Sequence, residues 1–260
     1  SVLNYFRALR GDEMIDIDQT ELSIHGSTEV PLIRLNETYR CHASVANFLQ
    51  KWVYTRDNIR YHSRRTETLP DIDILNRTTS GIEYTQPISL ITHTDTSSQQ
   101  SNIIEAEIVN SIITALPSET DVGVIAPHNA QKGLLSSSVP DNVHVDTVER
   151  FQGGEKDVLI LSTTVSDPTY ISAESDFLLN LNRLNVAVSR MKQKLIIIAP
   201  ETIFKIIPTD ILTYTHSMIW KGLYSDAVKQ DQTPWNGSLT QFNQEIPRQD
   251  TNLSIYNWGQ

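Results

Sequence analysis

The sequence of 260 residues has a single cysteine, Cys41, and no long run of apolar residues. One cysteine excludes an internal disulfide, and such usage is typical of a reducing, intracellular compartment. Without a long apolar run or a signal peptide, we expect a cytoplasmic location and no membrane partner. The first residue is Ser1 rather than methionine, so we expect the chain to be a piece of something longer.

Positive charge is also in short supply. The formal net charge is −10 at pH 7. This balance argues against a broad basic surface that coats nucleic acid. It remains compatible with a narrow groove lined by local arginine and lysine residues.

Several catalytic motifs are missing. No Gly-x-x-x-x-Gly-Lys-Ser/Thr loop occurs, and "GGEK" at 153–156 lacks both the length and the hydroxyl of one. Cys41 and His42 are adjacent in sequence, which suits neither a nucleophilic dyad nor a metal site. A Rossmann-type enzyme needs a glycine-rich loop after its first strand, and none is present. The acids of "DIDI" at 71–74 are too sparse for a nuclease. The chain therefore has no phosphate cradle of its own.

Short apolar runs alternate with amphipathic segments. We predict strands at 31–35, 88–92, 122–126, 143–146, 158–163 and 194–199, and helices at 42–54, 101–116, 129–135 and 182–192. Continuously apolar strands separated by helices predict an α/β fold, a mostly parallel sheet with helices on both faces.

The periodicity fades after Pro208, which predicts a tail that packs in places or not at all. We therefore divide the chain into a leading helix or linker at 1–30, a main domain at 31–207 and a C-terminal extension at 208–260.

Polar segments are expected to gather at one edge of this sheet. Ligands of open parallel sheets bind at the carboxyl ends of the strands. "NETYR", "APHNAQ" and "DTVERFQGGE" each follow a predicted strand. The last ends in two glycines and Glu155 directly before a buried strand, which suggests that something is held there.

Two arginines lie on the helix predicted at 182–192. Arg183 and Arg190 are two turns apart, so they share one face beside a buried stripe. Two aligned guanidiniums can grip phosphate oxygens. The alternative is a solvated helix edge, although Asn185 and Ser189 are poor helix formers and suggest contacts.

Arg40 poses a similar choice. It either ties down a loop or points at a ligand. It precedes a predicted helix that Asn36 or Thr38 would cap.

Four segments together resemble a known family. They are "RLNETYRCH", "VGVIAPHNAQ", "TVERFQGGEKDVLILS" and "RLNVAVSRMKQKLIIIAP". In this order they resemble the second motor domain of superfamily 1 helicases, in the branch of the nonsense-mediated-decay helicase, senataxin-like proteins and replication nuclease-helicases. The resemblance covers roughly residues 30 to 200.

The resemblance implies a RecA-like fold, related to P-loop NTPases but lacking the P-loop. It implies the C-terminal motor domain of an ATP-dependent helicase or translocase, acting in DNA repair or RNA processing. The cofactor would be ATP with Mg²⁺, whose ligands belong to a preceding RecA-like domain with the Walker A and B motifs. Single-stranded DNA or RNA would be the other partner. This segment alone is expected to be inactive, and a helicase-like remnant with a regulatory or docking role is the alternative.

The resemblance also assigns roles to nucleotide-facing residues. Arg40 and Arg190 would be arginine fingers that point at the γ-phosphate. Glu155 would hydrogen-bond the ribose, and Gly153 would let the backbone come close. The other nucleotide-side residues are Tyr39, Gln152 and Arg183, of which Gln152 and Arg183 would couple the cleft to strand movement.

Three further residues, Thr147, Asn129 and Gln131, would face the nucleic-acid backbone. The sequence departs from the family pattern at five positions, none of which removes a charged catalytic group: Cys41, Ala43, His128, Glu149 and Met191.

Overall fold

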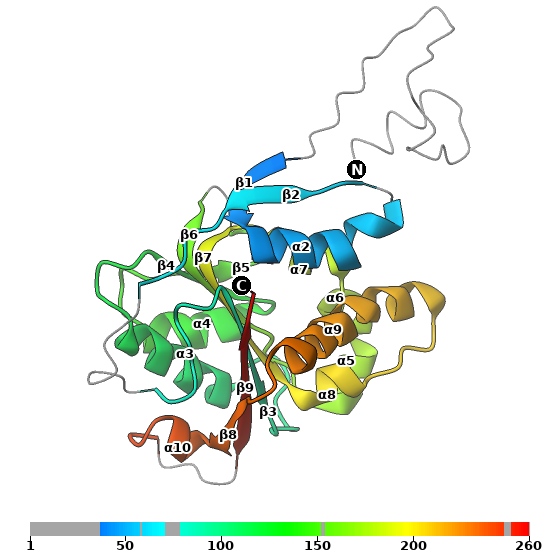
Figure 1. Cartoon of the computed structure of the whole chain (residues 1–260). Helices are drawn as coiled ribbons and strands as arrows, with labels where there is room; N and C mark the ends of the chain where they lie inside the picture. Colours follow the sequence, from blue (N-terminus) through cyan, green and yellow to red (C-terminus); the bar gives the residue numbers. More distant parts are fainter. Residues whose placement is uncertain (1–36, 58, 71–78, 152–153, 247–250, 260) are drawn as a thin grey trace, which may run out of the picture.

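The computed structural model describes residues 37–57, 59–70, 79–151, 154–246 and 251–259 (Figure 1). The leading segment 1–30, the strand expected at 31–35, and both Gln152 and Gly153 lie outside these residues. The described elements are β1 (Glu37–His42), α2 (Ala43–Trp52), η1 (Tyr54–Asp57), β2 (His62–Arg65), β3 (Ile88–His93), α3 (Ile103–Ala115), β4 (Val122–Ala126), α4 (Asn129–Ser138), β5 (His144–Thr147), β6 (Lys156–Ser162), α5 (Pro168–Ala173), α6 (Ser175–Leu178), α7 (Leu181–Val188), β7 (Met191–Pro200), α8 (Glu201–Lys205), α9 (Ile211–Gln230), β8 (Trp235–Ser238), α10 (Leu239–Phe242) and β9 (Asn252–Trp258).

Seven of the described strands form one sheet, in the order β5-β4-β6-β7-β3-β9-β8. The first five run parallel to one another, whereas β9 pairs antiparallel with both β3 and β8. The predicted α/β fold with a mostly parallel sheet is confirmed. The apolar strands are buried because both faces of the sheet are covered.

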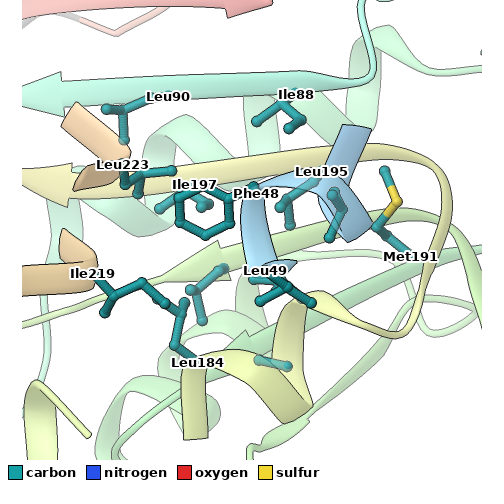
Figure 2. Close-up of a cluster of buried hydrophobic side chains, with 14 of the residues drawn as sticks. Phe48, Leu49, Ile88, Leu90, Leu184, Met191, Leu195, Ile197, Ile219 and Leu223 are labelled. Atoms are coloured by element: carbon teal, nitrogen blue, oxygen red, sulfur yellow. The ribbon is translucent and has the colours of Figure 1, made fainter. Parts of the chain in front are cut away.

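Helices cover the two faces in separate groups (Figure 1). Helices α2, α7 and α9 pack on one face, and α3 and α10 pack on the other. On β7, Leu195 and Ile197 face the first group, while Ile196 and Ile198 face the second, as the two-residue period of a strand requires. Figure 2 shows residues of α2, α7 and α9 converging on Leu195 and Ile197.

The region after Pro208 is more regular than its sequence pattern suggested. It contains the 20-residue helix α9 and the strand β9, which lies inside the sheet. In β9, Ile255 packs toward the face that carries α3, and Tyr256 packs toward the face that carries α2. Of the two expectations, that the region packs in places or not at all, the second is wrong, because these residues complete both cores.

Strands β1 and β2 form a second, two-stranded parallel sheet that does not pair with the large one. Tyr39 and Arg40 are thus inside a strand rather than in a loop. The N-cap of the helix that follows is His42 rather than Thr38, and Asn36 lies outside the described residues. The backbone N of Ser44 donates to His42 Nδ1 at 3.1 Å.

Candidate functional site

Two loops meet at the amino ends of β6 and β7. Glu155 directly precedes β6, and Arg190 directly precedes β7. The backbone N–H of Lys156 donates to the carbonyl oxygen of Arg190 at 3.0 Å. The pairing of β6 with β7 therefore brings Glu155 and Arg190 together at the amino ends of these two strands, which we call one edge of the sheet.

Strand β1 approaches the same edge. The backbone N of His42 contacts Met191 Sδ at 3.4 Å, which anchors the end of β1 beside the start of β7. His42 is buried, whereas Arg40 is exposed and Tyr39 is 60% exposed. Strand β1 thus holds an accessible aromatic ring and an accessible guanidinium two to three residues from its anchor.

Arg65 of β2 joins this group, although it was not among the residues predicted from the sequence. Its Nη2 lies 3.4 Å from Glu155 Oε2. Strand β2 brings it there because Arg65 pairs with His42 in the register of the small sheet. The only available signal was the basic pair in "HSRRT", which by itself does not indicate a partner.

Arg190 carries an unpaired buried group. Helix α7 ends at Val188, and the backbone N of Arg190 donates to the carbonyl oxygen of Ala187 at 3.3 Å. Within the described part of the chain, Arg190 Nε is buried without a hydrogen-bond partner. A buried unpaired donor is costly. The site therefore suits an anion such as a phosphate oxygen, which guanidinium groups bind well.

Arg183 lies in a different environment. Its guanidinium carbon is 3.9 Å from the ring centroid of Phe177, and it forms an ion pair with Glu149. The ring of His128 stacks on Phe177 with centroids 5.4 Å apart. The prediction that Arg183 and Arg190 share one helix face is wrong. The helix stops at Val188 because the following residues enter β7 and pair with β6.

His128 is a neutral member of this stack. Burial lowers the pKa of its imidazole; Glu174 opposes this, and the Arg183 guanidinium lowers the pKa further. The aromatic stack therefore carries one fixed positive charge, that of Arg183.

The residues expected to face nucleic acid lie at the opposite edge of the sheet. Thr147 ends β5 and is 6% exposed, while Asn129 opens α4 and is exposed. Gln131 is fully buried. It accepts from the backbone N of Asn102 at 2.7 Å and donates to Ser162 Oγ at 3.1 Å. Gln131 therefore completes the start of α3 and is not accessible to a strand.

The expectation of one site at the carboxyl ends is corrected by these positions. Arg40 lies within β1, and Glu155 and Arg190 precede their strands. Among the described residues between β5 and β6, Phe151 is buried against β4. A Cβ at Gly123 would lie 2.6 Å from Phe151 Cζ, so glycine is needed for this close approach. Candidate nucleotide-facing and strand-facing residues thus occupy opposite edges.

A family model described as AAA domain matches residues 19–202. The chain belongs to this AAA-domain family. Together with the helicase names of the relatives below, the match identifies the AAA domain as a superfamily 1 helicase motor domain, of the C-terminal RecA-like type.

Relatives of the AAA domain include three proteins from distant organisms. DNA replication ATP-dependent helicase/nuclease JHS1 of Arabidopsis thaliana is 32% identical over 106 residues, which are 40% of this chain and 8% of the relative. Probable helicase senataxin of Homo sapiens is 26% identical over 220 residues, 78% of this chain and 7% of the relative. Uncharacterized ATP-dependent helicase C05C10.2 of Caenorhabditis elegans is 30% identical over 180 residues, 65% of this chain and 11% of the relative. The chain thus spans a small part of each of these relatives.

Neither a membrane-spanning helix nor a metal-binding cluster occurs among the described residues. These residues contain no helix that is both long and apolar enough to cross a membrane. Over the same residues, no group of three or more histidine, cysteine, aspartate or glutamate side chains is arranged to hold a metal ion.

Proposed function

We propose that this domain is the second half of an ATP-driven motor that moves along single-stranded nucleic acid. It would close over ATP that is held by a preceding RecA-like domain with the Walker motifs. The observation that carries the proposal is the convergence of β1, Glu155 and Arg190 at one edge of the sheet. Three segments distant in sequence contribute polar side chains there.

Arg40 and Arg190 would act as arginine fingers. Their guanidinium groups would neutralise the charge that develops on the γ-phosphate, and Arg190 Nε has no hydrogen-bond partner among the described residues. An arginine finger contributes about 10³–10⁵ in rate, which is roughly 4–7 kcal/mol of the barrier. Mg²⁺ bound by the preceding domain would offset further phosphate charge.

Glu155 and Tyr39 would hold the nucleoside. The carboxylate of Glu155, which is 37% exposed, can accept hydrogen bonds from ribose hydroxyls. The ring of Tyr39 is exposed beside Arg40 and offers a flat surface for a base. Both residues would orient ATP so that the fingers meet its terminal phosphate.

The opposite edge would contact the strand. Asn129 is exposed at the start of α4, where backbone N–H groups favour a phosphate. Thr147 lies at the end of the neighbouring strand β5. Contacts of this kind read the backbone rather than the bases, so binding would weaken as salt rises.

Helix α7 would connect the two edges. Arg183 near its start packs on Phe177, and its end leads directly to Arg190. A shift of α7 on strand binding would therefore displace Arg190, which supports the proposed coupling of the cleft to strand movement.

A docking role without catalysis is the second candidate. Large apolar side chains are exposed on and before α9, including Ile207 at 73% and Ile211 at 86%. Such residues suit contact with another protein surface. The two candidates differ in whether ATP is hydrolysed.

The deciding experiment is single-strand-stimulated ATP hydrolysis by the longest natural chain that contains this domain. Arg190→Ala should remove most hydrolysis while ATP affinity changes only modestly. Arg150→Ala, at an exposed arginine preceding the buried Phe151, is the control and should keep the parent rate. Unchanged hydrolysis in Arg190→Ala would remove the finger assignment. A parent chain that hydrolyses no ATP would favour the docking role.

A further inference from the structure

We propose that Arg65 is a positioning residue for Glu155 and thereby sets the preference of this domain for nucleotides with ribose hydroxyls. The inference rests on the proposed function, in which Glu155 faces the ribose of ATP. Arg65 lies outside the four helicase-like segments, in strand β2. It acts through Glu155 rather than on the reacting phosphate.

The contact between the two side chains uses one oxygen of the carboxylate. Arg65 Nη2 lies 3.4 Å from Glu155 Oε2, and the Arg65 side chain is 23% exposed against 37% for Glu155. Among the described residues, Glu155 Oε1 has no hydrogen-bond partner, so that oxygen remains available to accept from a hydroxyl. A carboxylate fixed at one oxygen can present the other in a single direction, whereas a free glutamate rotates among rotamers.

Charge gives Arg65 a second effect. ATP is strongly anionic, and an unpaired carboxylate beside it would repel the phosphates. The guanidinium of Arg65 offsets the charge of Glu155 and still leaves an oxygen free to accept. Arg65 thus makes an acid compatible with an anionic ligand.

The neighbouring Arg64 provides the contrast. It pairs with Glu37 at 2.8 Å, and these side chains are 65% and 50% exposed. Arg64 is on the same strand as Arg65 and has the same chemistry, but its ion pair reaches across to β1 and does not involve Glu155. Arg64→Gln is therefore a matched control for Arg65→Gln.

The test is equilibrium binding of ATP and of 2′,3′-dideoxy-ATP to the longest natural chain that contains the domain. The ratio of the two dissociation constants reports recognition of the ribose hydroxyls. Glu155→Gln should abolish the parent's preference for ATP. Arg65→Gln should reduce this preference about threefold to fivefold, the scale of a half-exposed ion pair, and Arg64→Gln should leave it unchanged.

Two further variants separate positioning from folding. Arg65→Lys keeps the charge without the planar fork, so its preference should fall between those of the parent and Arg65→Gln. The double variant Arg65→Gln, Glu155→Gln should match Glu155→Gln alone, because Arg65 acts only through that acid. Thermal unfolding of each variant verifies that it folds. If Arg65→Gln does not fold, the nucleotide preference of Arg65→Lys is compared with that of the parent instead.

The outcomes distinguish a failure of the positioning role of Arg65 from a failure of the ribose contact of Glu155. If Glu155→Gln loses the preference while both Arg65 variants keep it, Arg65 has no positioning role and the ribose contact of Glu155 stands. If Glu155→Gln itself keeps the preference, the ribose assignment is wrong and the role of Arg65 is lost with it. Equal effects of the Arg64 and Arg65 substitutions would also overturn the inference, because they would indicate a general charge effect.

Discussion

His93 and Glu105 form a fully buried pair in which Nε2 lies 3.1 Å from Oε1. The other carboxylate oxygen of Glu105 accepts from Ser162 Oγ and from the backbone N of Thr164, the latter at 2.9 Å. One side chain of α3 thereby joins the carboxyl ends of β3 and β6. Thr164 has a φ of 71°, a left-handed conformation that is unusual outside glycine and is held here by this bond.

Glu105→Ala should destabilise the domain strongly. The substitution leaves several buried donors without an acceptor, and the expected loss is about 3–5 kcal/mol of unfolding free energy. Urea unfolding checks this value. Glu119→Ala, at an exposed position, should stay within about 0.5 kcal/mol of the parent. Similar losses in the two variants would contradict the role of the buried network.

Lys194 should make stability depend on pH. Burial lowers the pKa of its ammonium group to about 7, although Nζ donates to the carbonyl oxygens of Glu83 and Gln86 and to Ser89 Oγ. The unfolded chain, with an ordinary lysine pKa of about 10.4, binds more protons between these two values. Unfolding free energy should therefore rise from about pH 7 toward pH 10, by at most about 1.4 kcal/mol per pH unit.

Lys194→Met provides the comparison for that rise. The variant should lose this component of the pH dependence, and the difference between the two curves isolates Lys194 from other groups. Denaturant titrations at several pH values measure both curves. Parallel curves would mean that Lys194 titrates alike in the folded and unfolded chains.

Phe177→Ala should uncouple strand binding from hydrolysis. The change removes the ring that contacts both Arg183 and His128, at an expected cost of about 1–2 kcal/mol in local packing. The ratio of strand-stimulated to basal ATP hydrolysis should fall, while basal hydrolysis persists. Tyr214→Ala removes an exposed ring whose cation, Lys221, lies 5.5 Å from its centroid, and should leave the ratio unchanged. A normal ratio in Phe177→Ala would exclude this stack as the link.

The sheet could be predicted from the sequence because its strands are buried on both faces. The runs that form β4, β6 and β7 are continuously apolar, and each appears close to its predicted place. Strand β2 could not be found in this way, because "HSRR" is polar and half exposed. Helix α9 was hidden by apolar residues on its exposed side, such as Ile211, which blur the helical period.

The candidate site was predictable in its residues more than in its arrangement. The order of segments singled out Arg40, Glu155 and Arg190 as candidates, but the place of the last two at the amino ends of β6 and β7 follows from the strand bounds and pairing. Gln131 was expected to face nucleic acid, but its side-chain amide is buried and bonds to Asn102 and Ser162. The sequence alone does not show whether a polar side chain is buried. The contact of Arg65 with Glu155 could not be predicted, because it depends on the register of β2 with β1. The sequence of β2 has no periodic pattern that would have shown a strand there.

The place of β9 beside β3 has a consequence for how the chain is made. Strand β3 has β7 on one side and β9 on the other, and β9 comes near the end of the sequence. During synthesis from the amino terminus, β3 has an open hydrogen-bonding edge until residues 252–258 leave the ribosome. Open edges recruit other strands. The nascent domain thus keeps one edge of β3 open after β7 has paired and until β9 is added.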